Sequence, residues 1–238
     1  MRGWFAGVLG GLCVGVTTPA HAQAPDHCRL ALVLALDVSS SVDAEEYVLQ
    51  RDGLAAALDD ASIREAILDG EGHVAAAIYE WSGRRQSAII SPWLTLGQDA
   101  DIDELIRRLQ STPRSHSRFP TALGYALGFG ATLLEQGPEC DRRVIDVSGD
   151  GKNNDGFSPQ LAYRNYPFRN VTVNGLAVLG GTPNVVEYFQ REVRFGFGAF
   201  VETSDGYQGY REAMTRKLFR ELNDMTLSAR PVKSERPG

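Results

Sequence analysis

The stretch Leu30–Ser41, with the sequence LALVLALDVSSS, decides how the rest of the chain is interpreted. Seven consecutive apolar residues, Leu30–Leu36, predict a strand buried on both faces, which is typical of a parallel sheet. The run stops at Asp37. Alternate residues of an extended segment project to one side, so Asp37, Ser39 and Ser41 can point together beyond the strand. One carboxylate and two hydroxyls suit a hard divalent cation such as Mg²⁺.

Strand and helix patterns alternate along most of the chain, which predicts an α/β fold. A short polar link, Ser82–Arg85, favours an antiparallel hairpin at one sheet edge. We therefore expect a doubly wound, mostly parallel central sheet of about six strands, with one antiparallel edge strand and helices on both faces. Further strands are expected at His73–Trp81, Gln86–Trp93, Arg143–Ser148, Val171–Leu179 and Ala199–Glu202, and helices at Tyr47–Leu58, Ala61–Leu68, Asp101–Leu109, Thr121–Glu135, Ser158–Tyr163, Val185–Arg191 and Gly209–Leu227.

Composition limits the possible partners. The chain has 238 residues, of which 43% are hydrophobic and 23% charged, so one ordinary domain with a sizeable core is expected. The formal net charge of −6 leaves no basic surface for nucleic acid and no Lys and Arg cluster for anionic lipid. Four histidines argue against a His-rich metal centre.

The N-terminus has the three-part order of a secretory signal peptide. A positive start, Met1–Gly3, precedes the apolar run Trp4–Val16, and Ala20–Ala22 is a small-x-small cleavage site. The alternative is an uncleaved anchor, but this run is shorter than the roughly 20 residues that span a bilayer. We therefore expect a periplasmic or secreted protein with no membrane span after cleavage. The expected division is a signal peptide at 1–22, a domain at 23–229 and a disordered tail at 230–238.

Two cysteines remain after cleavage, Cys28 and Cys140. An even pair in an oxidising compartment favours a disulfide. Each precedes a predicted strand, so both would lie at the same sheet edge if those strands are parallel neighbours. Free, inert thiols are the alternative.

Two other segments carry oxygen donors for the same edge of the sheet. The predicted strand Arg143–Ser148 ends two residues before Asp150, and Thr121 stands at the start of a predicted helix. In doubly wound sheets, ligands bind beyond the carboxyl ends of the strands, where the chain order reverses. Because one loop cannot supply six ligands, we expect these two residues to contribute to the same cation site.

Three motifs in this order resemble those of a known family. DVSSS at 37–41, TALGYAL at 121–127 and GDG at 149–151 resemble the three segments of the metal-ion-dependent adhesion site of von Willebrand factor A-type domains. The resemblance covers about Leu30–Leu227. Within this family, the chain is similar to a secreted bacterial subfamily.

The resemblance implies a role for each of five residues. Ser39 and Ser41 would bind Mg²⁺ (or Mn²⁺) directly, and Thr121 would bind it in the ligand-bound arrangement. Asp37 and Asp150 would act mostly through coordinated water, as outer carboxylates do. One metal position would stay open for the Asp or Glu carboxylate of an unidentified partner protein. The resemblance thus implies a secreted, metal-dependent, adhesion-type binding domain; the sequence leaves its oligomeric state open.

The chain departs from the family pattern at two places. Phe119–Pro120 stands where a Gly-Gly pair usually precedes the threonine, so the loop carrying Thr121 is expected to be stiffer. Ser148–Gly149 precedes Asp150, where a threonine is commoner. The terminal helix, Gly209–Leu227, occupies the place of the helix that shifts with affinity in some relatives.

Other interpretations compete for the same residues. The serines can simply cap the next helix, and Asp150 can be an ordinary turn acid. An EF-hand loop starting at Asp146 fails because its twelfth residue is Phe157 rather than a bidentate Glu. The polar run Asn153–Asp155 is expected to form a solvated Asx-rich turn; the alternative is contact with a ligand or a second cation.

Catalysis has little support in the sequence, so we expect a protein that is not an enzyme. His27 and His73 lie at the wrong sheet edge for a Ser-His-Asp triad, which leaves His116, and no G-x-S-x-G motif is present. A metal-assisted hydrolase and a fold-only scaffold with an empty site remain the alternatives.

Overall fold

The six strands form one mostly parallel sheet. A computed structural model of the chain describes Met1 and residues 27–223, so the rest of the expected signal peptide and the expected tail lie outside the described residues. The strands run in the order β3-β2-β1-β4-β5-β6, and only β2 and β3 pair antiparallel. The predicted fold class is therefore confirmed. The strands are β1 (Cys28–Asp37), β2 (His73–Trp81), β3 (Ser87–Leu96), β4 (Arg142–Gly149), β5 (Val171–Val178) and β6 (Val201–Ser204).

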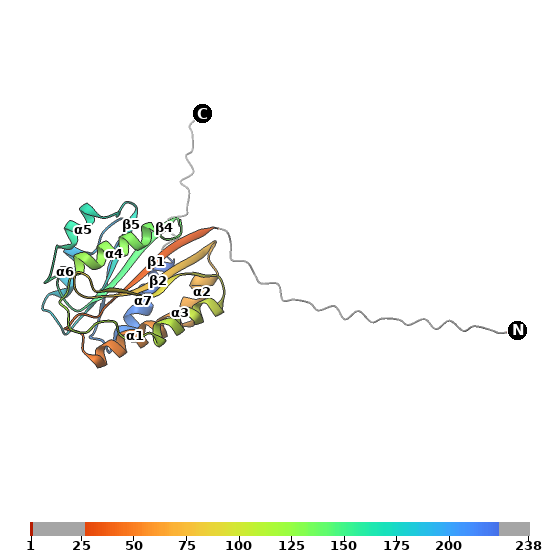
Figure 1. Ribbon diagram of the computed structural model, residues 1–238, viewed down its shortest axis with the longest axis horizontal. Coiled ribbons are helices and arrows are strands. Elements are labelled where there is room, and N and C mark those ends of the chain that lie inside the picture. The colour runs from red at the N-terminus through yellow and green to blue at the C-terminus, as the bar shows by residue number, and fades with distance from the viewer. Residues whose placement is uncertain (2–26, 224–238) are drawn as a thin grey trace, which may run out of the picture.

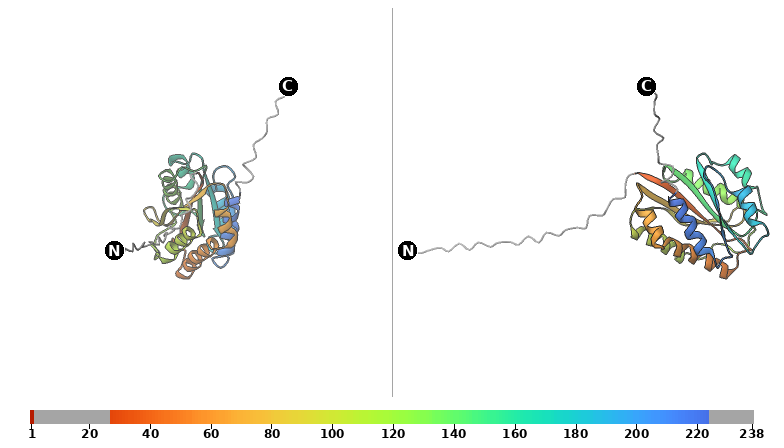
Figure 2. Two further views of the ribbon diagram at one scale, coloured as in Figure 1. Left: turned by 90° about the vertical axis from the view of Figure 1, so that its right-hand side faces the viewer. Right: turned by 180° about the vertical axis from the view of Figure 1, so that it is seen from behind.

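Helices cover both faces of this sheet (Figures 1 and 2). One layer holds α1 (Ala44–Leu58), α2 (Ala61–Leu68), α3 (Asp99–Ser111) and α7 (Tyr210–Asn223); the other holds α4 (Leu123–Glu135), α5 (Pro159–Asn165) and α6 (Val185–Tyr188), which continues as a π-helix over Phe189–Val193.

The central strand β1 contributes to two separate cores. Leu30, Leu32, Leu34 and Leu36 pack in the core under α1, α2, α3 and α7, and the alanines and valine between them pack in the core under α4. Both faces of β1 are buried, which explains its uninterrupted apolar run. Its neighbours are β2 and β4, so the chain order reverses at β1 and a crevice is expected beyond the ends of β1 and β4.

One helix begins later than its sequence pattern predicts. Helix α4 starts at Leu123, which leaves Thr121 in the preceding loop. The backbone N–H of Thr121 donates to Asn154 Oδ1 (2.9 Å), and the carbonyl of Thr121 accepts from the backbone N–H groups of Asn154 and Asp155. These bonds tie Thr121 to the loop after β4, so it is held outside the helix.

A buried charge cluster fastens α7 to the sheet. The Lys217 ammonium lies 2.6 Å from Asp146 on β4 and 2.7 Å from Glu221 one turn along α7. Asn174 on β5 donates to the same Glu221 oxygen at 2.7 Å. All four side chains are buried. One cation therefore faces two carboxyl groups without solvent.

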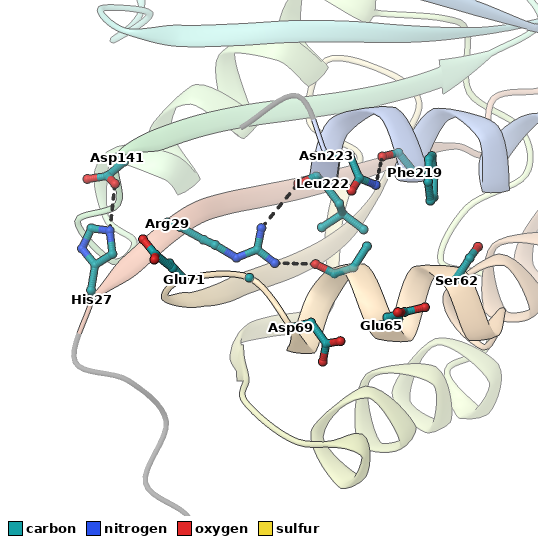
Figure 3. Close-up of a pocket in the computed structure, with 12 residues that line it drawn as sticks. His27, Arg29, Ser62, Glu65, Asp69, Glu71, Asp141, Phe219, Leu222 and Asn223 are labelled. Atoms are coloured by element: carbon teal, nitrogen blue, oxygen red, sulfur yellow. Dashed lines mark hydrogen bonds and ion pairs between the residues drawn. The ribbon is translucent and has the colours of Figure 1, made fainter. Parts of the chain in front are cut away.

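A disulfide and a buried arginine connect neighbouring elements at the amino ends of β1 and β4. Cys28 and Cys140 form the favoured disulfide, across a sequence separation of 112 residues. The buried Arg29 guanidinium donates to the carbonyls of Ala66 at the end of α2 and Leu222 at the end of α7 (Figure 3). It lines a cavity of about 770 Å³ at the opposite end of the sheet from the predicted cation site.

Candidate metal centre

Three loops meet beyond the carboxyl ends of β1 and β4. The backbone N–H of Ser40, after β1, donates to the carbonyl of Phe119, before α4, at 2.8 Å. The backbone N–H of Asn154, after β4, donates to the carbonyl of Thr121 at 2.9 Å. The loop before α4 is thus bonded to both of the others. This junction brings together residues that are more than a hundred positions apart in sequence.

The side chains on these loops form one hydrogen-bonded group. Ser41 Oγ donates to Asp150 Oδ1 at 2.8 Å, and the hydroxyls of Ser39 and Ser41 lie 3.2 Å apart. Thr121 Oγ1 donates to Ser39 Oγ at 3.4 Å. Asp37 Oδ1 accepts from the backbone N–H of Ser39 at 2.7 Å. All five residues predicted as metal ligands or outer carboxylates therefore lie in one place; their role in metal binding remains a prediction.

Asp37 is the most unusual member of this group. Its side chain is fully buried, and its Oδ2 atom has no hydrogen-bond partner within the described residues. The pKa of the Asp37 carboxyl is raised to about 7, mainly by burial and also by the nearby charge of Asp150, although hydrogen bonds from Ser39 act in the opposite direction. A nearby cation would strongly stabilise the charged form of a carboxylate that is buried in this way.

Two glycines leave room beside the carboxylates. A Cβ atom at Gly149 would lie 2.9 Å from Asp37 Oδ2, and one at Gly181 would lie 2.6 Å from Asp150 Oδ2. Both contacts are too close for any side chain without movement of the carboxylate. The donor set is three hydroxyls and two carboxylates, one with an unpaired buried oxygen, and it fits a small hard cation.

A buried chain of hydrogen bonds supports the first loop from below. Gln50 Nε2 on α1 donates to the carbonyl of Asp37 at 2.8 Å, and Gln50 Oε1 accepts from Ser148 Oγ at 3.2 Å. Tyr210 at the start of α7 donates to Ser148 Oγ at 3.0 Å. Gln50 was not predicted from the sequence. The pattern that could have revealed it is a polar residue on the apolar stripe of α1, between Tyr47 and Leu54.

Arg114 holds the same loop from the side. Its Nη2 atom donates to the carbonyls of Val38 (3.1 Å), Ser39 (3.2 Å) and Val42 (2.8 Å). Three carbonyls of one tight loop are thereby turned toward a single guanidinium, which fixes the loop's curvature. Sequence analysis missed Arg114 as well, because an arginine in an irregular loop carries no pattern that reveals its partners.

The loop after β4 is bonded to its neighbours through its side chains. Asn153 Oδ1 accepts from the backbone N–H of Gly124 in the first turn of α4 at 3.1 Å, and Asn154 Oδ1 accepts from Thr121. Asp155 pairs with Arg84 of the hairpin link at 2.7 Å. Asn154 is exposed and its two neighbours are half-buried, as expected of a solvated turn. The Asn154 side chain also fixes the position of Thr121.

The sequence itself matches one protein family. A profile of the family described as "Protein of unknown function (DUF1194)" matches residues 27–226. The chain belongs to this family. The match covers all six strands, so the three loops of the candidate site lie within the DUF1194 region. No curated protein matches this DUF1194 chain in sequence.

Solved structures resemble the DUF1194 fold closely enough to classify it. A von Willebrand factor type A protein from Catenulispora acidiphila has a TM-score of 0.60 at 14% identity, over 82% of this chain and 43% of that one. Proximal thread matrix protein 1 from the mussel byssus, with a zinc-occupied MIDAS motif, has a TM-score of 0.60 at 16% identity, over 83% and 48%. The PilB minor pilin from Streptococcus sanguinis has a TM-score of 0.64 at 10% identity, over 86% and 64%.

These comparisons show that the DUF1194 domain has a von Willebrand factor A-like fold. The chain spans about half the length of the mussel protein and less than two thirds of the other two. Identities of 10–16% establish the fold alone.

Two further findings concern the described region. Within residues 27–223, no three His, Cys, Asp or Glu side chains gather as a group that could hold a metal ion. No helix in that part of the chain combines the length and apolar character needed to cross a bilayer.

Proposed function

We propose that this DUF1194 protein is a secreted, divalent-metal-dependent binding domain that holds an acidic group of a partner protein through a bound Mg²⁺ or Mn²⁺ ion. The observation that carries the proposal is the hydrogen-bonded group of Ser39, Ser41, Thr121 and Asp150 beside the unpaired, buried Oδ2 of Asp37. The von Willebrand factor A-like fold supports it, as does the zinc-occupied MIDAS motif of the mussel protein.

The five residues would divide the work between them. Ser39, Ser41 and Thr121 would hold the ion through their hydroxyl oxygens, and Asp37 and Asp150 would act through coordinated water. When bound, the ion supplies a Lewis-acidic position for an incoming carboxylate. Because hydroxyl ligands are neutral, much of the ion's charge stays available to a partner's Asp or Glu. The hydrogen bonds from Gln50 and Arg114 to the loop backbone keep the two serines in place.

Binding is better supported than metal-assisted hydrolysis. A hydrolase needs a general base beside the metal-bound water. His116, the histidine that the sequence leaves at this edge, packs its ring edge-on against Phe119 with centroids 5.3 Å apart. A periplasmic or secreted location is supported by the Cys28–Cys140 disulfide, since such bonds persist outside the reducing cytosol.

A capture experiment with two matched serine variants tests the proposal. Wild type, Ser39→Ala and Ser40→Ala are immobilised and exposed to periplasmic extract with Mg²⁺, with chelator, and with chelator followed by excess Mg²⁺. Ser40 is the control because its side chain is exposed and belongs to neither position of the motif.

The proposal predicts one outcome for each arm. Wild type and Ser40→Ala should retain a partner with Mg²⁺, lose it with chelator and regain it when Mg²⁺ returns, whereas Ser39→Ala should retain nothing in any arm. Partner lists that are identical in all arms would contradict metal-dependent binding. Turnover of phosphoester or peptide substrates that is lost in Asp37→Ala would favour the hydrolase instead.

A further inference from the structure

A fourth segment reaches the carboxyl edge of the sheet beside the candidate site. Strand β6 ends at Ser204, and residues 205–209 lead from it into α7. Tyr207, in the middle of this segment, is 5% exposed, and its ring stacks on that of Tyr210 with centroids 6.3 Å apart. Tyr210 is the residue that donates to Ser148 below the metal loops. No sequence motif marks Tyr207, and the five-residue site does not include it.

The Tyr207 hydroxyl is buried without a hydrogen-bond partner among the described residues. Leaving a buried hydroxyl unpaired costs free energy, and native proteins usually satisfy such groups with protein atoms or ordered water. The same is true of Asp37 Oδ2, a buried acceptor. A donor and an acceptor are thus both unpaired.

The two unpaired groups belong to the same polar region. Burial raises the pKa of the Tyr207 phenol well above its usual value, and the charges of Asp37 and then Asp150 raise it further. The charges of both carboxylates thus act on the hydroxyl, but it has no hydrogen bond to either. An intervening polar group would satisfy the donor and the acceptor together.

We propose that Tyr207 is a positioning residue of the metal centre, whose hydroxyl donates a hydrogen bond to the water layer between the bound ion and the carboxylates of Asp37 and Asp150. This inference rests on the proposed function, because that water layer exists as described only when the ion is bound. It adds the β6–α7 segment to the three loops as a fourth support of the site. The hydroxyl has no hydrogen-bond partner in the metal-free protein, and it would gain one when the ion binds with its water.

The variant Tyr207→Phe tests this by removing one oxygen atom and keeping the ring. Tyr79→Phe is the matched control: Tyr79 is also fully buried, but its hydroxyl already donates to the carbonyl of Ala126 at 2.7 Å. Mn²⁺ affinity is measured by the electron paramagnetic resonance signal of free Mn²⁺, and the melting temperature is measured in chelator for the same three proteins.

The two variants should respond in opposite ways. Tyr207→Phe should bind Mn²⁺ about tenfold more weakly than wild type, as expected for loss of one hydrogen bond to a charged centre, while melting in chelator at or above the wild-type temperature. Tyr79→Phe should bind Mn²⁺ like wild type and melt lower, since it loses a bond that the metal-free fold already has.

Two results would overturn the inference. The first is wild-type Mn²⁺ affinity in Tyr207→Phe. The second is a Tyr207→Phe protein that melts well below wild type in chelator, because its hydroxyl would then have a partner in the metal-free fold. A wild-type protein that binds no Mn²⁺ is a different result: it refutes the proposed function itself, and this inference with it.

Discussion

Replacement of Lys217 by methionine should strongly destabilise the domain. The Lys217 ammonium is completely buried between Asp146 at 2.6 Å and Glu221 at 2.7 Å. Methionine nearly matches the volume of the side chain but removes its charge, so the carboxyl groups of Asp146 and Glu221 lose the cation that lies between them. Removing one partner of a buried ion pair typically costs about 3–5 kcal/mol. For a domain of this size, that corresponds to a fall in melting temperature of roughly 6–20 °C.

Asp146→Asn should behave very differently. Burial, and next the charge of Glu221, raise the pKa of Asp146 to about 8, although Lys217 acts in the opposite direction. The shift favours the protonated, neutral form of Asp146, which asparagine mimics. We expect a cost of about 1 kcal/mol or less, comparable with an ordinary hydrogen-bond change.

The same pKa shift fixes the sign of a pH effect. The folded state holds the Asp146 proton more tightly than the unfolded chain, whose Asp residues titrate near pH 4. The contribution of this group to stability is therefore present below about pH 4 and is lost as pH rises toward 8. Asp146→Asn lacks this dependence, so its stability relative to wild type should rise between pH 5 and pH 8.

Chemical denaturation of wild type, Lys217→Met and Asp146→Asn at pH 5, 7 and 8 measures these differences. The account of the cluster fails if Lys217→Met unfolds within about 0.5 kcal/mol of wild type at pH 7, a difference typical of neutral surface substitutions. It fails equally if Asp146→Asn is as damaging as Lys217→Met at that pH, or if its relative stability falls with increasing pH.

Further predictions concern the metal centre and the disulfide. Mg²⁺ at 100 times its dissociation constant should add about 2.7 kcal/mol of stability in thermal scans; an equal gain in Ser39→Ala would count against the site. Gly149→Ala should weaken Mg²⁺ binding in calorimetry by tenfold or more, because the added methyl lies 2.9 Å from Asp37 Oδ2; unchanged affinity would show that the space is not needed. Thiol titration of denatured protein without reductant should find neither Cys28 nor Cys140 free. Cys140→Ser should lower the free energy of unfolding by about 4–5 kcal/mol, because the disulfide closes a loop across a sequence separation of 112 residues. A stability loss below 1 kcal/mol would contradict that estimate.

The sequence was enough to predict the sheet because its evidence is local. The uninterrupted run of β1 reflects burial on both faces, and the hairpin link at Ser82–Arg85 predicted the antiparallel pairing of β2 and β3. Asp37, Ser39, Ser41 and Asp150 could be placed together because the carboxyl ends of neighbouring parallel strands meet at one edge.

The features that local patterns missed depend on contacts between distant segments. The apolar spacing predicted a helix from Thr121, but hydrogen bonds from the loop after β4 hold that residue outside α4. Lys217 and Glu221 have the spacing of an exposed helical ion pair, and only the packing of α7 on β4 buries them. Arg114 likewise belongs to no motif, because it bonds to a loop 72–76 positions away in sequence. Gln50 lies only 13 positions from Asp37, but a buried amide on a helix does not reveal which carbonyl it meets.

Crystallography with Mn²⁺ tests the central claim most directly, because anomalous scattering identifies the ion independently of any refined coordinates. The account predicts a single strong anomalous peak beyond the ends of β1 and β4, at roughly 2.0–2.3 Å from the hydroxyl oxygens of Ser39 and Ser41. The Asp37 and Asp150 carboxylates should lie one water molecule further out. A protein that carries no ion there at millimolar Mn²⁺, or that binds it elsewhere on the molecule, would contradict the claim.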